Sequence, residues 1–314
     1  MMNAVWPVSG QNKGEINLKH SWKKLLSLVL VFTLLYPMLL PAAALADAAP
    51  GDVIVTLGEN LSPADREKIL AEMNETEETE IITVSNQEER EYLGDYISSS
   101  QIGTRALSST KITLAEQGAG INVETNNITW VSEGMYANAL VTAGVEDAEI
   151  YVTAPFPVSG TAALTGLIKA YEIAAEIEIP EEQKQVANEE MVRTAELAES
   201  IGVEEATELM NRIKEEIANN PVESEEDLRE LIRRIAAELG IELTEQELDG
   251  LVSLFMRMKD LNINWDQVQD QISKVRDNLG EFLAREDTQN FISRFLEVIA
   301  QLIEALKGLF TSEA

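Results

Sequence analysis

The sequence contains no cysteine, and its single histidine, His20, lies within the first 46 of its 314 residues. Disulfide bonds and thiolate nucleophiles are therefore excluded. Catalytic triads that depend on histidine, and the usual zinc sites, need side chains that the rest of the chain does not have. The chemistry that remains is that of paired carboxylates, of a serine beside a lysine, or of a cation held by oxygen atoms.

Positive charge is also scarce, with 24 lysine and arginine residues against 55 aspartate and glutamate residues and a formal net charge of −31. Nucleic acids and other polyanions are bound mainly through lysine and arginine, so nucleic acid is excluded as a partner. Aromatic residues make up only 5% of the chain, which leaves few rings to stack on sugars. The acidity needs no specific partner, because a high net charge by itself favours solubility.

The first 46 residues have the layout of a secretory signal. A polar segment with four lysines and one glutamate precedes the apolar run Leu25–Leu40, and the small residues of Ala44–Ala46 follow. This pattern predicts cleavage after Ala46 and an extracytoplasmic location, secreted or associated with the cell envelope. A retained membrane anchor is the alternative, although the run is shorter than the roughly 20 residues that span a bilayer. Cleavage would leave 268 residues with 20 basic and 54 acidic side chains, a formal charge of −34.

Residues 47–178 alternate between strand and helix signals and predict an α/β domain with a mixed sheet in the order β-α-β-α-β-β-α-β-α. Glycines at 118 and 120 predict a hairpin between the third and fourth strands. The predicted strands are Val53–Leu57, Ile81–Val84, Ala106–Ala115, Ile121–Thr125 and Ile150–Ala154. Three helices are expected to begin at the caps Ser62, Asn86 and Ser132, the third of them ending at Gly144, and a fourth begins at about Ser159.

Residues 179–314 contain helix caps and helix-ending glycines but no strand signals, which predicts an all-helical second domain that ends in a long amphipathic helix. A length of 268 residues after cleavage favours two domains over one. The expected helices begin near Pro180 and Val203, at the cap Ser224, at a capping box of Thr244 with Glu247, and at Asn264, and the last helical region extends to Leu309.

The junction between the last predicted strand and the helix that follows it is the candidate ligand site. A helix start with free amides can hold an anion, and Ser159 or Thr161 can cap the helix. The alternative interpretation is a turn that needs only a glycine and a cap. The candidate ligand-binding residues are Pro155, Pro157, Ser159, Gly160 and Thr161.

An apolar stripe at helical spacing occupies the end of the chain and predicts an interaction face. Three surfaces could cover it: the protein's own helices, a second copy or an unknown envelope protein, and the membrane surface. The membrane is disfavoured, because the polar face has no excess of basic residues. The residues of this face are Ile292, Phe295, Leu296, Ile299, Leu302, Ile303 and Leu306.

Three further motifs carry little specificity. Ser108 and Lys111 match the S-x-x-K pattern but lie in a predicted strand, where they point to opposite faces. The segment Asp260–Asp266 resembles half a calcium loop without its glycine and its closing glutamate. Glu189 and Glu190 are the first acids to test, although a solvated helix face explains them as well. The sequence therefore predicts no catalytic residue, no metal ligand and no cofactor.

Several blocks of the sequence resemble a known family. They are GDVIVTLG (Gly51–Gly58), YLGDYI (Tyr92–Ile97), QIGTRALSS (Gln101–Ser109), VTAPFPVSGTAALTG (Val152–Gly166) and VANEEMV (Val186–Val192). They are similar to conserved blocks of domain-of-unknown-function family 1002, exported proteins of spore-forming Gram-positive bacteria. The resemblance implies an extracytoplasmic location and brings no catalytic residues with it.

Two functions remain open from the sequence. The first is an exported, non-catalytic interaction or binding module of the bacterial cell envelope. The second is a hydrolase that acts on envelope sugars or peptides through two carboxylates. The absence of cysteine, the loss of the single histidine with the signal and the shortage of aromatic rings favour the first.

Overall fold

The computed structural model describes residues 49–261 and 263–284. The predicted signal and the predicted interaction face from Ile292 to Leu306 lie outside these residues. Among the helices described, none combines the length and the apolar character needed to span a bilayer.

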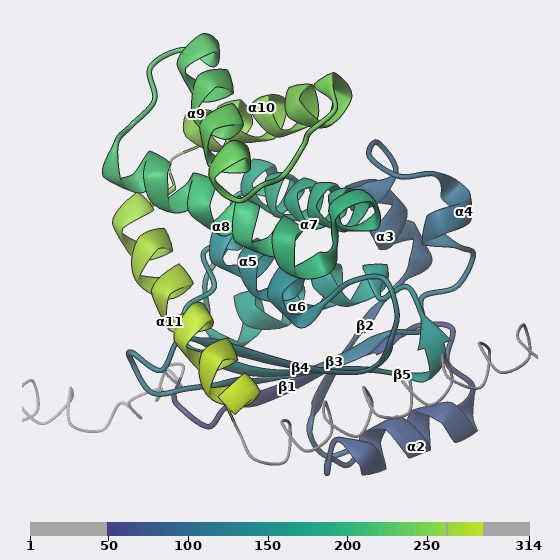
Figure 1. The fold of residues 1–314 in the computed structure, drawn as a ribbon. Coiled ribbons are helices and arrows are strands. Elements are labelled where there is room, and N and C mark those ends of the chain that lie inside the picture. The colour runs from purple at the N-terminus through teal and green to yellow at the C-terminus, as the bar shows by residue number, and fades with distance from the viewer. Residues whose placement is uncertain (1–48, 262, 285–314) are drawn as a thin grey trace, which may run out of the picture. The chain divides into compact units, whose positions relative to one another are not determined.

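A five-stranded mixed sheet forms the first half of the structure, as predicted (Figure 1). Its strand order is β2-β1-β3-β5-β4, with β1 parallel to β2 and β4 parallel to β5, whereas β3 runs antiparallel to both β1 and β5. The strands are β1 (Val53–Gly58), β2 (Glu80–Val84), β3 (Ser109–Leu114), β4 (Ile121–Ile128) and β5 (Ala148–Val158).

The predicted hairpin between β3 and β4 is wrong, because β5 lies between these two strands. Ile150 of β5 is opposite Ile112 of β3 on one side and Val123 of β4 on the other. The glycine-rich turn instead binds a carboxylate, since the backbone N–H groups of residues 118 and 120 donate to Asp147 at 2.8 and 2.6 Å. Asp147 immediately precedes β5, so the turn passes over the start of that strand.

Helices cover both faces of the sheet (Figure 1). On one face α6 packs on β1 and β3 and α5 packs on β4, and on the other α2 packs against side chains of β1 and β5. The predicted caps Ser62 and Ser132 are confirmed, whereas Ser85 caps α3 where Asn86 was predicted to do so. The helices are α2 (Pro63–Glu72), α3 (Asn86–Leu93), α4 (Ser99–Ile102), α5 (Glu133–Ala143) and α6 (Thr161–Ala174).

The second half is helical, as predicted, and its caps include the expected Ser224 and the capping box of Thr244 with Glu247. Glutamates occupy the first turns of α7, α8, α9 and α10, where they complement the positive end of the helix dipole. The helices are α7 (Glu181–Ile201), α8 (Val203–Asn219), α9 (Glu225–Glu238), α10 (Glu245–Asp260) and α11 (Trp265–Ala284).

Helix α7 contributes to both large apolar cores. Met191 and Val192 belong to the core between the sheet and its covering helices, whereas Val186 and Leu197 belong to the core formed with α8, α9 and α10. The predicted domain boundary at residues 178 and 179 falls just before α7, and packing continues across it. The two halves are therefore joined through a helix that is covered on opposite sides.

The turn between β5 and α6 depends on Gly160, which adopts φ +96° at the N-cap position. The prediction that Ser159 or Thr161 caps this helix is wrong, because α6 has no side-chain cap. The Tyr136 hydroxyl instead donates to the Gly160 carbonyl at 2.6 Å. A Cβ atom at position 160 would lie closer than 3.0 Å to both Tyr136 and Ile128, so a glycine is required at this position for two reasons.

Substituting Gly160→Ala tests this double requirement. We expect a loss of about 3 kcal/mol in the free energy of unfolding, measured by urea titration, from strained backbone and steric overlap together. The matched control is Gly118→Ala, since Gly118 has φ +93° but open space around it, and it should lose only about 1–2 kcal/mol. Equal losses for both variants would show that the overlap at residue 160 is relieved without cost.

Candidate functional site

The predicted ligand residues lie along the end of β5 and the start of α6. Pro155 and Pro157 belong to β5, and Gly160 and Thr161 are buried. Pro157 and Ser159 open onto a cavity of about 360 Å³, which we call the hinge pocket. Its lining is completed by Gln101, Thr129, Trp130, Val158 and Glu199.

The chemistry of the hinge pocket is that of a polar site with one aromatic wall. The Trp130 indole N–H donates to Glu199 Oε1 at 2.9 Å. Among the described residues that line this pocket, Glu199 is the only charged one, and none is a lysine or arginine. A single unbalanced carboxylate favours neutral or cationic groups and disfavours anions.

A buried carboxyl group lies behind the hinge pocket. The Ser159 and Thr161 hydroxyls are 3.1 Å apart, and Thr161 donates to Glu89, which also accepts from Asn86 at 3.0 Å. Glu89 is 1% exposed. Its burial raises the pKa of its carboxyl, and the hydrogen bonds from Thr161 and Asn86 oppose that shift.

The protein therefore places a carboxyl group of its own beside the start of α6, where the sequence predicts a bound anion. A second anion would meet the Glu89 side chain there. Nothing in the sequence distinguishes Glu89 from its neighbours Glu88 and Glu91, because burial of this position depends on how α3 packs on α6 and α7.

Glu189 and Glu190 do not lie on a solvated helix face, and that interpretation is wrong, since they are 2% and 0% exposed. Glu190 pairs with Lys214 of α8 and accepts from the Thr142 hydroxyl of α5. Glu189 pairs with Arg257 of α10 on the other side. The reason for the burial is that neighbouring helices cover α7 on opposite sides.

The pair of Glu190 and Lys214 is fully buried. Burial raises the pKa of Glu190 and lowers that of Lys214, and each charge opposes the shift of the other. The Lys214 ammonium also donates to the Asn138 carbonyl at 2.9 Å. These contacts engage Glu190 inside the protein, so it has no open face toward a substrate.

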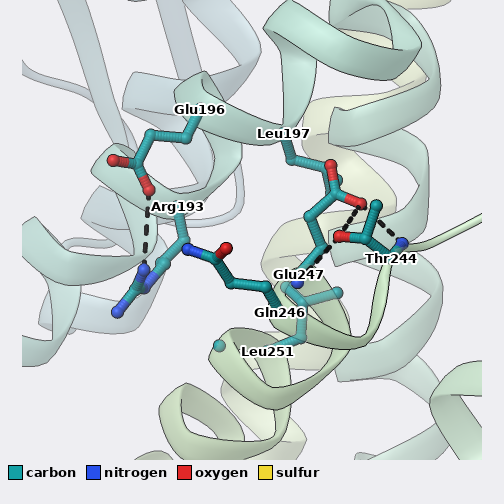
Figure 2. Close-up of a pocket in the computed structure, with 8 residues that line it drawn as sticks. Arg193, Glu196, Leu197, Thr244, Gln246, Glu247 and Leu251 are labelled. Atoms are coloured by element: carbon teal, nitrogen blue, oxygen red, sulfur yellow. Dashed lines mark hydrogen bonds and ion pairs between the residues drawn. The ribbon is translucent and has the colours of Figure 1, made fainter.

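A second cavity of about 360 Å³, which the sequence did not predict, lies between α7 and α10 (Figure 2). Arg193 extends into it from α7, with its Nη1 atom 3.5 Å from Glu196. Gly250, an isolated glycine inside α10, is the sequence signal that could have indicated it. The lining of this α7–α10 pocket is Arg193, Glu196, Leu197, Thr244, Gln246, Glu247, Gly250 and Leu251.

A third cavity, of about 340 Å³, lies between α3, α6 and α7 and contains two lysines that are already paired. Lys169 contacts Glu88 at 2.7 Å, and Lys184 contacts Glu172 at 3.3 Å. In the part of the chain that the structure describes, no group of three acidic or histidine side chains is placed to hold a metal ion.

Comparison with known proteins identifies relatives of this chain. A family model described as "Protein of unknown function (DUF1002)" matches residues 57–275. The chain is 49% identical over 274 residues to the uncharacterized protein YpuA of Bacillus subtilis (strain 168), which corresponds to 87% of this chain and 94% of the relative. No solved structure matches. The resemblance identified from the sequence blocks is confirmed.

The buried pair on α7 and α8 can be tested by a double-mutant cycle. Lys214→Met leaves the Glu190 carboxylate buried without its cation, so we expect a loss of about 3–5 kcal/mol in the free energy of unfolding. Glu190→Leu should cost a similar amount. The double variant removes both charges and should recover most of the loss in urea titrations. Additive losses would show that the two side chains do not stabilise each other.

Glu89 and Glu88 should respond to pH in opposite ways. The raised pKa of Glu89 means that the folded state binds its proton more tightly than the unfolded state, so its contribution to stability falls as the pH rises through that pKa. For Glu88, burial acts against ionisation, but hydrogen bonds from Lys169 and Ser85 outweigh it and lower the pKa, so its contribution is lost as the pH falls.

We therefore expect Glu89→Gln to match or exceed the parent protein in stability near neutral pH and to show less decline as the pH rises above the ordinary pKa of a glutamate. Glu88→Gln is the matched control and should be destabilised near neutral pH. Urea unfolding at a series of pH values measures both. A Glu89→Gln variant that is destabilised only near neutral pH would contradict the raised pKa of Glu89.

Proposed function

We propose that this chain, which belongs to the DUF1002 family of proteins of unknown function, is an exported, non-catalytic binding module of the bacterial cell envelope. The signal-like residues 1–46 support export. The acidic composition supports solubility outside the cell and argues against nucleic acid and other polyanions as ligands.

The observation that carries this proposal is the burial of Glu189 and Glu190, the two acids that the sequence puts first for hydrolysis. A glycosidase needs two carboxyl groups that face the same scissile bond from an open cleft. Glu189 and Glu190 instead point to different neighbouring helices and are engaged by Arg257 and Lys214. Their role is to hold α7 in place, which is a structural function.

The hinge pocket is the surface on which we place ligand recognition. Trp130 and Pro157 offer flat apolar contact, and Gln101, Thr129 and Ser159 offer neutral hydrogen-bonding groups. Glu199 adds one negative charge. This composition suits an uncharged or cationic segment of an envelope polymer or protein.

Binding of the purified protein to isolated bacterial envelopes tests the proposal, with Trp130→Ala as the site variant. Loss of the aromatic wall should weaken binding at least about tenfold, as for other central aromatic contacts. Phe156→Ala is the matched control, because Phe156 is 43% exposed and close in sequence but does not line the pocket. Its binding should equal that of the parent protein.

Two results would contradict the proposal. The first is equal binding by the parent protein and Trp130→Ala, with circular dichroism showing that both are folded. The second is hydrolysis of envelope glycan or peptide by the purified protein, with loss of turnover on substitution of a single acidic residue. The second result would instead support the carboxylate-dependent hydrolase.

A further inference from the structure

The α7–α10 pocket contains an arginine whose hydrogen-bonding capacity is largely unused. Arg193 Nε lies 3.7 Å from Glu189, and Nη1 lies 3.5 Å from Glu196. Charge-assisted hydrogen bonds are shorter, at about 2.7–2.9 Å. The Nε atom is also buried without a hydrogen-bond partner. The stronger contact of Glu189 is to Arg257, so Arg193 is the weaker partner of that carboxylate.

The guanidinium of Arg193 lies beside Gly250 of α10. A Cβ atom at position 250 would be 3.6 Å from Nη1 and 3.7 Å from both Cζ and Nε of Arg193. A glycine inside a helix is less stable than alanine by about 0.5–1 kcal/mol, so this position has a local cost. A Cβ atom there would make only ordinary van der Waals contact with the guanidinium, so the glycine leaves open space beside Arg193 in the pocket.

The other lining groups complete a small amphipathic site. Gln246 extends from the first turn of α10 toward Arg193, and Leu197 and Leu251 supply apolar surface (Figure 2). The carboxylate of Glu247 is occupied, because it accepts from Ser200 and from the backbone and hydroxyl of Thr244. The site therefore offers one guanidinium, one amide and an aliphatic wall, with the carboxylate of Glu196 beside the guanidinium.

We propose that the α7–α10 pocket binds a carboxylate that carries a short aliphatic group. Arg193 and Gln246 hold the carboxylate, and Leu197 and Leu251 contact the aliphatic part. A carboxylate matches the planar fork of a guanidinium. A phosphate with two charges would be repelled by Glu196 and Glu247, so the site favours a single negative charge.

Glu196 is the internal competitor for Arg193. Burial raises the pKa of the Glu196 carboxyl, Arg193 opposes this shift, and the nearby Glu199 adds to it. A ligand carboxylate must displace the contact between Arg193 and Glu196, which is long. Neutralising Glu196 should therefore tighten ligand binding. The hinge pocket is not involved in this proposal, which stands whether or not ligand recognition occurs there.

Isothermal titration calorimetry with four probes tests the site on the full protein. Acetyl-trialanine and its C-terminal amide differ only in the carboxylate, and propionate and propionamide differ in the same way without a peptide. We expect each acid to bind at least tenfold more tightly than its amide. A peptide acid that binds more tightly than propionate would identify a peptide C-terminus as the source, and equal affinities would identify a small free acid.

Three variants and one control connect the binding to the pocket. Arg193→Gln and Gln246→Ala should each weaken binding of the acids, the first by at least tenfold, and Glu196→Gln should tighten it severalfold. Arg233→Gln is the control, because Arg233 is an exposed arginine that pairs with Glu245 outside the pocket. Its binding should equal that of the parent protein.

The proposal is overturned if acids and amides bind equally, if no acid binds at millimolar concentration, or if Arg193→Gln binds as the parent does. Gln246 is exposed, so its variant is expected to fold and provides the answer if Arg193→Gln does not. An unchanged affinity in Gln246→Ala together with an unchanged affinity in Glu196→Gln would also exclude this pocket.

Discussion

The burial of charge on α7 is the constraint on which the rest of the structure depends. Glu190 pairs with Lys214 of α8 on one side, and Glu189 pairs with Arg257 of α10 on another. A buried ion pair gains little over an apolar contact, but it leaves a costly unpaired charge when either partner is displaced. Alternative positions of α8 and α10 are therefore penalised, and the helical half is held in one register on α7.

The hinge pocket and the α7–α10 pocket depend on the same helix. Glu199, near the C-terminal end of α7, forms part of the hinge pocket, and Arg193 and Glu196 form part of the pocket shared with α10. Their geometry thus depends on the ion pairs that fix α7. Helix α7 has apolar residues in two separate cores, and its two buried acids pair with different helices. It therefore forms part of the lining of both pockets, whose other residues come from distant parts of the sequence.

Much of this fold could be predicted from the sequence because caps and periodicity are local signals. Ser132 and Gly144 bracket α5, and Thr244 with Glu247 opens α10, as expected. The order of strands could not be predicted, since the insertion of β5 between β3 and β4 depends on pairing between distant residues. The same limit applies to the sites. The five candidate ligand residues come from one segment, and two of them, Pro157 and Ser159, line the hinge pocket. The Trp130 and Glu199 of that pocket come from elsewhere in the chain.

The acidity of the protein acts differently at long and short range. A formal charge of −31 repels anions from a distance, but at physiological ionic strength this field is screened beyond about 8 Å. Selectivity within a pocket is therefore set by the charges that line it. The described residues that line the hinge pocket include one carboxylate and no cation, whereas the α7–α10 pocket has a guanidinium that the neighbouring acids hold only loosely. Two surfaces on one polyanion can thus prefer ligand groups of opposite charge, because the local pairing of each pocket outweighs the net charge of the chain.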